Sequence, residues 1–328
     1  MPILVTGVAG FIGYHVSMAL LARGEEVLGV DVVNDYYDVS LKEARLSILK
    51  KQTGFTFYKV DITDIEGMNE VVAEAGELQR VVHLAAQVGV RNSITNPFDY
   101  VWANLVGHLS ILEICRNQPN FKHLVYASSS SVYGGNTKLP FSVDDPTDLP
   151  VSLYAATKKA DELMSHCYGH LYGFPQTGLR FFTVYGPWGR PDMAVYIFCK
   201  AIFEGRRFPV FNNGDMKRDF TFIDDIVAGV IASLDNPPTS IDKQVPCRLY
   251  NIGNHSSEPL MKMIGLIEEA LGKKAKIDFK PMQPGDVKES LADIEEIKTD
   301  LDYNPTTPID IGIPKFVEWF KEYEGGLA

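Results

Sequence analysis

Tyr154 and Lys158 have the residue types and the spacing for proton transfer to and from an alcohol. They stand four positions apart in the run Tyr-Ala-Ala-Thr-Lys, so within a helix they share one face, one turn from each other. A neutral tyrosine is a weak base, but a neighbouring ammonium group stabilises the phenolate form and makes proton abstraction practicable. The pair therefore predicts a site that oxidises an alcohol carbon by removing a proton and a hydride.

Four consecutive serines follow the apolar stretch His123–Ala127 and precede this pair in the chain. If that stretch is a buried parallel strand, the serines stand at its carboxyl end, where ligands bind in open sheets. The hydroxyl of Ser129 would then assist Tyr154 at the reacting alcohol, while Ser130 and Ser131 would contact the rest of the substrate. A polar turn that satisfies backbone groups is the alternative explanation.

Three glycines near the amino terminus predict a cradle for a dinucleotide. They follow the short apolar run 3–5, and the helical pattern from Phe11 to Arg23 begins among them. Glycines allow a sharp turn and a close approach to a pyrophosphate, which the free amides of the helix N-terminus bind. The spacing is G-x-x-G-x-x-G rather than the commoner G-x-G-x-x-G. The residues of this predicted cradle are Gly7, Gly10, Phe11, Ile12 and Gly13.

Polar residues at the ends of the next two apolar runs support this interpretation. Asp31 ends the run 27–30, about 20 residues beyond the glycines, where a carboxylate binds the adenosine ribose. A carboxylate there also repels a 2′-phosphate, so NAD is favoured over NADP. Asn34 would add a polar contact, and Asp61 with Ile62 would meet the adenine.

These residues must be positioned by alternating strands and helices. Short apolar runs separated by helical patterns predict parallel strands that are covered on both faces. We therefore expect an α/β protein, with a doubly wound Rossmann domain over residues 1–182 and a smaller α/β substrate domain over residues 183–328 that sends segments back to the sheet. Strands are expected at 3–5, 27–30, 55–60, 81–84, 123–127 and 178–182, helices at 11–23, 97–116, 152–172, 194–204, 225–234, 258–271 and 310–323, and loops at 245–247 and 280–285.

The composition argues against several other classes of protein. A formal net charge of −11 disfavours a nucleic-acid partner, because such proteins carry a basic face. No run of about 20 apolar residues is present to cross a membrane, and no signal segment precedes the first glycine, so we expect a cytoplasmic enzyme. The four cysteines lack metal-binding spacing, and His166 and His170 lack a third ligand, so no metal site is expected.

Together these motifs resemble those of the extended short-chain dehydrogenase/reductase family along nearly the whole chain. The marks are TGVAGFIG at 6–13, HLAA at 83–86, SSSSVYG at 128–134, YAATK at 154–158 and RDFTFIDD at 218–225. The family includes nucleotide-sugar epimerases and dehydratases. The segments LRFFTVYGPWGRPDMA at 179–194 and QPGDV at 283–287 are similar to those of its UDP-glucuronate 4-epimerases. The resemblance implies reversible oxidation of a UDP-sugar at carbon 4, with NAD as the cofactor.

The resemblance also implies roles for individual residues. Tyr154 would be the base, Lys158 its partner and a ribose ligand, and Ser129 a catalytic hydroxyl. Arg190 would hold the glucuronate carboxylate, with Thr183 in contact with the sugar near it. A homodimer is expected by analogy. The remaining implied contacts are those of the cofactor with Leu84, Ala85, Ala86 and Asn104, of the pyrophosphate with Arg218, and of the uridine ribose with Asp286.

Related activities remain as alternatives. A UDP-glucose or UDP-N-acetylglucosamine 4-epimerase is disfavoured because Gln283 and Thr183 replace the arginine and asparagine of many such enzymes. A dehydratase or decarboxylase is disfavoured because Ser130 and Ser131 stand where many of them carry a carboxylate. A non-catalytic NAD-binding sensor is disfavoured because such proteins typically lack the tyrosine–lysine pair. Asn92 stands where the glucuronate subgroup often has tyrosine, and this leaves details of the pocket open.

Overall fold

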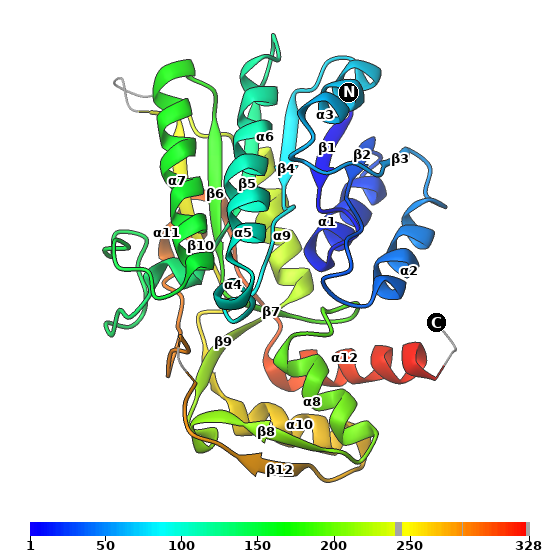
Figure 1. Ribbon diagram of the computed structural model, residues 1–328, viewed down its shortest axis with the longest axis vertical. Helices are drawn as coiled ribbons and strands as arrows, with labels where there is room; N and C mark the ends of the chain where they lie inside the picture. Colours follow the sequence, from blue (N-terminus) through cyan, green and yellow to red (C-terminus); the bar gives the residue numbers. More distant parts are fainter. Residues whose placement is uncertain (240–244, 284, 326–328) are drawn as a thin grey trace.

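A seven-stranded sheet with all neighbouring strands parallel forms the larger part of the molecule (Figure 1). The computed structural model describes residues 1–239, 245–283 and 285–325. The strand order is β10–β6–β5–β4–β1–β2–β3, and β1, β2 and β6 are buried along their whole length. The strands are β1 (Ile3–Thr6), β2 (Val27–Val30), β3 (Phe55–Tyr58), β4 (Arg80–His83), β5 (His123–Ser129), β6 (Gln176–Phe181) and β10 (Cys247–Ile252).

Helices cover both faces of this sheet, so the predicted doubly wound Rossmann fold is confirmed. α1 packs against α2 and α9 on one face, whereas α3, α6 and α7 form the layer on the other. α7 rests on β5 and β6. These helices are α1 (Phe11–Ala22), α2 (Val39–Leu49), α3 (Ile65–Ala75), α4 (Asn92–Thr95), α5 (Pro97–Tyr100), α6 (Gly107–Arg116), α7 (Leu153–Tyr172) and α9 (Ile223–Asp235).

A smaller α/β portion lies beyond the carboxyl ends of the sheet strands (Figure 1). It holds two small sheets, in the orders β11–β9–β7 and β12–β8, and its α10 packs against α8 and α12. The chain returns to the large sheet through α9 and through β10, which pairs with β6. The elements of this portion are β7 (Thr183–Tyr185), β8 (Arg207–Val210), β9 (Lys217–Phe222), β11 (Ser257–Pro259), β12 (Lys276–Phe279), α8 (Ala194–Phe203), α10 (Leu260–Leu271), α11 (Glu295–Leu301) and α12 (Ile309–Glu324).

One apolar cluster joins the two portions. It runs from Val5 of β1 and Leu20 of α1 through Ile226 of α9 to Ile264 of α10 and Phe316 of α12, all of them buried. A second cluster fills the space between the other face of the sheet and α3, α6 and α7. The space between the two portions is therefore framed by a continuous packed core, which limits how far its walls can move relative to one another.

The structure differs from the sequence prediction in several elements. The predicted helix 97–116 contains a π-helical turn, Val101–Val106, between α5 and α6. The predicted loop at 245–247 leads into β10, whose pattern is obscured by the buried polar Asn251. α2 is absent from the prediction because Lys42 and Arg45 interrupt its buried face. The prediction also lacks α3, whose buried face is short, and the small strands β8, β9, β11 and β12.

No helix in the described ranges is both long and apolar enough to cross a bilayer. The four cysteines carry free thiols. Pro284, which belongs to the QPGDV motif and to the predicted loop 280–285, lies outside the described residues.

Candidate active site

A cavity of about 420 Å³ lies at the carboxyl ends of the sheet strands. The segments that follow β1, β2, β4 and β5 form much of its wall, and the start of α7 borders it. A parallel sheet brings these segments to one edge, which is why residues far apart in the chain meet there. The predicted ligands that line it are Gly7, Gly10, Phe11, Ile12, Gly13, Asp31, Asn34, Asp61, Ile62, Leu84, Ala85, Ala86, Ser129, Ser130, Ser131, Tyr154, Lys158, Thr183 and Arg190.

Close backbone packing explains the glycine spacing in the first turn. A Cβ atom on Gly13 would lie 2.1 Å from the Gly7 carbonyl oxygen, and one on Gly7 would lie 2.7 Å from the Ala85 amide nitrogen. Gly7 also has a φ of 73°, which disfavours any side chain. Gly10 caps α1 without a side-chain hydrogen bond. The amide end of α1 is thus open to an anion in the cavity.

The Asp31 carboxylate lies at the end of β2 and holds the cradle in place. Its Oδ2 accepts a hydrogen bond from the Ala9 amide at 3.0 Å, and its Oδ1 accepts one from the Val33 amide at 2.8 Å. Burial raises the pKa of Asp31, and these amides with the Lys42 ammonium oppose that effect. Lys42 donates to the backbone and side-chain oxygens of Asn34, so both predicted polar ligands belong to one network.

Tyr154 and Lys158 lie in the first two turns of α7. The Ser152 hydroxyl caps this helix by accepting a hydrogen bond from the Ala155 amide at 3.1 Å. Lys158 is 3% exposed, and its Nζ donates to the carbonyl oxygen of Ala127 at 3.0 Å. This bond ties the helix to the end of β5 and places Tyr154, one turn earlier, at the cavity.

A buried ion pair holds the next part of α7 against the sheet. The Arg180 guanidinium of β6 donates to Glu162 of α7 through Nε at 2.8 Å and Nη2 at 2.9 Å. The Ser128 hydroxyl donates to the same carboxylate at 2.6 Å. Burial alone would raise the pKa of Glu162, but Arg180, together with Ser128 and Lys159, outweighs it and holds that pKa below its usual value. The pair therefore remains charged and fully hydrogen-bonded, as a buried pair must to be stable.

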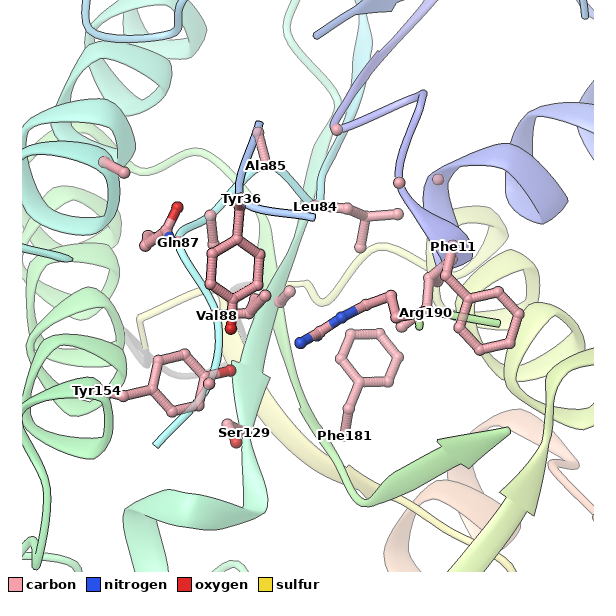
Figure 2. Close-up of a pocket in the computed structure, with 18 of the residues that line it drawn as sticks. Phe11, Tyr36, Leu84, Ala85, Gln87, Val88, Ser129, Tyr154, Phe181 and Arg190 are labelled. Atoms are coloured by element: carbon pink, nitrogen blue, oxygen red, sulfur yellow. The ribbon is translucent and has the colours of Figure 1, made fainter. Parts of the chain in front are cut away.

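Several polar groups converge in the cavity beside the catalytic pair (Figure 2). The Tyr154 and Tyr36 hydroxyls and the Arg190 guanidinium all point into this space, and Ser129 borders it at the end of β5. The Ser129 oxygen accepts a hydrogen bond from the Ser131 amide at 3.1 Å, so its hydrogen remains available to a substrate. This arrangement can bind an alcohol, remove its proton and hold an anionic group nearby.

Arg190 is held in place by a carboxylate two residues away. Its Nε donates to Asp192 at 3.0 Å and its Nη2 at 2.5 Å, while the Tyr36 hydroxyl donates to the same carboxylate at 3.3 Å. Burial alone would lower the pKa of Arg190, but Asp192 outweighs it and raises that pKa above its usual value. The guanidinium is therefore cationic, and within the described residues its Nη1 makes no hydrogen bond that would compete with a ligand.

Asn104, a predicted cofactor ligand, does not line the cavity. It is 1% exposed, and its side chain bonds the backbone amide and carbonyl of Gln87 and donates to the Thr157 hydroxyl at 2.9 Å. It therefore braces the loop after β4 against α7. Asn104 thus supports residues that line the site, and its contact with the cofactor stays a prediction.

Arg218 and Asp286 also lie outside the lining of this cavity. Asp286 forms an ion pair with Arg91 at 2.9 Å. Burial lowers the pKa of Arg218. The charge of Arg91 lowers it further, whereas the charge of Asp286 raises it. Arg91, Arg218 and Asp286 therefore lie close enough to affect one another's charge. Arg91 follows Val90, which lines the cavity. The structure thus places two guanidinium groups near its rim, one of which sequence reasoning misses.

Arg45 is the most consequential residue that sequence reasoning misses. It is fully buried, and its Nη1 donates to the Ala9 carbonyl and to the Tyr37 hydroxyl, both at 2.8 Å. Its Nη2 donates to the Trp188 carbonyl at 2.6 Å. Arg45 thus joins the glycine cradle to the segment that carries Arg190. No local signal marks it, because an arginine in a helix is ordinarily a surface residue.

The comparisons with known proteins agree with this geometry. The fold, the site and the matches that follow place this chain in the extended short-chain dehydrogenase/reductase family. More narrowly, the chain belongs to the protein family described as GDP-mannose 4,6 dehydratase, whose model matches residues 4–316.

Individual relatives show which proteins of this family the chain is similar to. Protein CapI of Staphylococcus aureus is 49% identical over 98% of this chain and 99% of its own length. UDP-glucuronate 4-epimerase 4 of Arabidopsis thaliana is 47% identical over 99% of this chain and 76% of its own length. The crystal structure of UDP-glucuronic acid 4-epimerase from Bacillus cereus, in complex with UDP-glucuronic acid and NAD, has a TM-score of 0.89 and 34% identity over 98% of this chain and 100% of that chain.

Replacing Arg45 by methionine is expected to lower the free energy of unfolding by about 2–4 kcal/mol, because two buried carbonyl groups lose their donor. Urea unfolding followed by fluorescence measures the change. The matched variant Arg206→Met removes an arginine whose side chain is 58% exposed, and it should cost less than about 0.5 kcal/mol. Equal losses in the two variants would show that Arg45 does not join the cradle to the neighbouring segment.

Proposed function

We propose that this chain is a UDP-glucuronate 4-epimerase that retains NAD during turnover and produces UDP-galacturonate. The observation that carries the proposal is the Arg190 guanidinium, which is fixed by Asp192 and points into the same space as the Tyr154 hydroxyl (Figure 2). A site for a neutral sugar has no need of a fixed cation there. The named activities of the Arabidopsis and Bacillus relatives support this assignment.

The residues present fit NAD as the resident cofactor. The cradle of Gly7 and Gly13 is too close-packed for any side chain, and the uncapped amide end of α1 suits a pyrophosphate. Asp31 is placed for the adenosine ribose and would repel the 2′-phosphate of NADP. Asp61 and Ile62 would lie by the adenine. When bound, NAD would supply a reversible hydride acceptor for the sugar.

The reaction that these residues support is oxidation at carbon 4 of the sugar followed by reduction from the opposite face. Tyr154, as its phenolate, removes the proton of the carbon 4 hydroxyl, and Lys158 stabilises that phenolate. Ser129 donates to the same sugar oxygen and orients it. The 4-keto sugar then rotates in the cavity, so that hydride return gives the other epimer. Tyr154 returns its proton to the oxygen, which leaves the enzyme unchanged.

The carboxylate of the oxidised sugar requires restraint, because a β-keto acid loses carbon dioxide readily. Arg190 would bind this carboxylate and keep its bond out of alignment with the ketone. Thr183, Ser130 and Ser131 line the same cavity and would add hydroxyl contacts. Among the described lining residues the acidic side chains are Asp31 and Asp61, which follow β2 and β3; two strands lie between β5 and β2, and three lie between β5 and β3. Among the described lining residues, no carboxylate therefore stands beside Ser130 and Ser131 for the proton transfers of a dehydratase.

The uridine diphosphate would extend from the cavity toward Arg91 and Arg218. Two guanidinium groups suit the paired oxygens of a diphosphate. Asp286, which pairs with Arg91, is placed near them and would accept hydrogen bonds from the uridine ribose.

The proposal includes a homodimer that acts in the cytoplasm. Large apolar side chains gather on α5, the π-helical turn, α6 and α7, which lie side by side (Figure 1). A second copy of the chain would cover this face, so the enzyme acts as a homodimer in this proposal. The free cysteines accord with a reducing cytoplasm. The most exposed apolar side chains of the face are Phe98 (75%), Trp102 (61%), Leu163 (60%) and Leu171 (60%).

Purified enzyme given UDP-glucuronate without added NAD is expected to form UDP-galacturonate, with no UDP-pentose and no lasting NADH. Proton NMR of the sugar anomeric signals measures the products. The Tyr154→Phe variant, which lacks the base, should be slower by about 10²-fold or more. A UDP-pentose product would contradict the restraint proposed for Arg190. Conversion of UDP-glucose alone would move the assignment to the glucose-type epimerases.

The Arg190→Ala variant is expected to raise the share of decarboxylated UDP-pentose and to raise the KM for UDP-glucuronate about 10–100-fold, because a charge-assisted contact is lost. Product ratios by NMR and initial rates measure the two effects. Any slow turnover of UDP-glucose serves as an internal control, because that sugar has no carboxylate and its KM should change little. An unchanged product ratio would show that Arg190 does not restrain the carboxylate.

A further inference from the structure

A buried carboxylate that the proposed reaction does not use lies directly behind Lys158. Asp161 stands one turn further along α7 and is 1% exposed, and its Oδ2 accepts a hydrogen bond from the Lys158 Nζ at 3.0 Å. Its other oxygen, Oδ1, is buried and has no hydrogen-bond partner within the described residues. A carboxylate that is only half satisfied in the interior is costly, so its place beside Lys158 requires an explanation.

The hydrogen bonds of the Lys158 ammonium explain why the Asp161 carboxylate is buried there. An ammonium group has three N–H donors. Within the described residues, Lys158 directs one to the Ala127 carbonyl and another to Asp161, both at 3.0 Å. These two acceptors lie on different elements, β5 and α7, so together they fix the direction of the third donor. That donor is the one left for the cavity, which Lys158 lines.

We propose that Asp161 is a positioning residue, which fixes the direction of the Lys158 ammonium and, through its negative charge, limits how strongly that ammonium stabilises the Tyr154 phenolate. The inference rests on the proposed function only in taking Tyr154 as the base. It deepens that proposal by placing the control of the base outside the cavity wall, since Asp161 does not line the cavity.

The groups around this pair keep a constant charge near neutral pH, which leaves Asp161 as the one that changes. Burial lowers the pKa of His83 to about 3, and it lowers that of His108 well below the usual value. Burial raises the pKa of Tyr126 well above the usual value, and Glu162 is kept ionised by Arg180. The titratable groups that face the pair are thus His83 of β4, His108 of α6, Tyr126 of β5 and Glu162 of α7.

The carboxylate itself titrates in an accessible range. Burial raises the pKa of Asp161 to about 6, and the Lys158 charge opposes this shift. Because the folded-state pKa is raised, Asp161 is ionised above about pH 6 and neutral below it. As the pH falls through this range, the charge that opposes Lys158 is lost. The pH profile of kcat should therefore carry an inflection near pH 6 that belongs to Asp161.

Two variants of the full-length holoenzyme separate charge from position. Asp161→Asn removes the charge but keeps an oxygen that can accept the Lys158 hydrogen bond, whereas Asp161→Ala removes both. The first readout is the ultraviolet absorbance of tyrosinate during a pH titration, with the Tyr154→Phe protein as the blank, so that the difference reports Tyr154 alone. The second is the pH profile of kcat and KM.

In Asp161→Asn the tyrosinate signal is expected at a pH lower by about 0.5–1 unit, and the inflection near pH 6 should vanish. In Asp161→Ala the kcat is expected to fall about tenfold beyond that of Asp161→Asn, with KM changed less than about twofold, because the ammonium loses its direction. The control Asp235→Asn makes the same change of charge at the end of α9, where Asp235 pairs with Arg23, and should alter neither readout.

An unmoved tyrosinate signal in Asp161→Asn would overturn the role of the charge. Equal kcat values in the two variants would overturn the role in positioning. The titration needs no sugar substrate, so it tests Asp161 even if UDP-glucuronate is not converted. Failure of the proposed function would appear instead as no epimer in the wild-type protein.

Discussion

The packing of α7 against the ends of β5 and β6 is the constraint on which the whole site depends. The Glu162–Arg180 pair and the bond from Lys158 to the Ala127 carbonyl fix this helix to the sheet at two points. Both are buried, and loss of one partner of such an ion pair typically costs about 3–5 kcal/mol because the other charge is left uncompensated. A rigid helix is what lets a tyrosine and a lysine, one turn apart, act on a single substrate atom.

The second constraint joins the cofactor side of the cavity to the sugar side. The segment that carries Arg190 is held by Arg45 at Trp188 and by His15, which donates to the Pro187 carbonyl at 2.9 Å. Arg45 also holds the glycine cradle through Ala9. The cradle and the segment that carries Arg190 are therefore positioned by the same buried side chain. In the proposed reaction, this shared support would hold Arg190 in place relative to the cofactor side of the cavity.

Local patterns predict the parts of the site whose geometry follows from a single element. The glycine spacing, Asp31 at a strand end, and the pair of Tyr154 and Lys158 on one helix face are of this kind, and all line the cavity. Arg45 and Asp161 are not predictable in this way, because their roles depend on which elements pack against them. Asn104 is similar in this respect: the resemblance implies a cofactor contact, whereas its hydrogen bonds to Gln87 and Thr157, which brace the loop after β4 against α7, are visible only in the structure. Likewise, β10 is not predicted, because it contains the polar Asn251. The hydrogen-bond partners of this side chain, among them the Tyr133 hydroxyl, lie far away in the sequence.

The central claim is that the hydrogen on carbon 4 leaves and returns within one active site, while Tyr154 handles only the hydroxyl proton. The direct test uses UDP-glucuronate that carries deuterium at carbon 4, incubated with the enzyme in ordinary water without added NAD. Mass spectrometry and NMR then locate the isotope in the product. The account predicts UDP-galacturonate with the deuterium fully retained at carbon 4. Loss of the deuterium to water during epimerisation would contradict it, because the carbon-bound hydrogen would then have left as a proton.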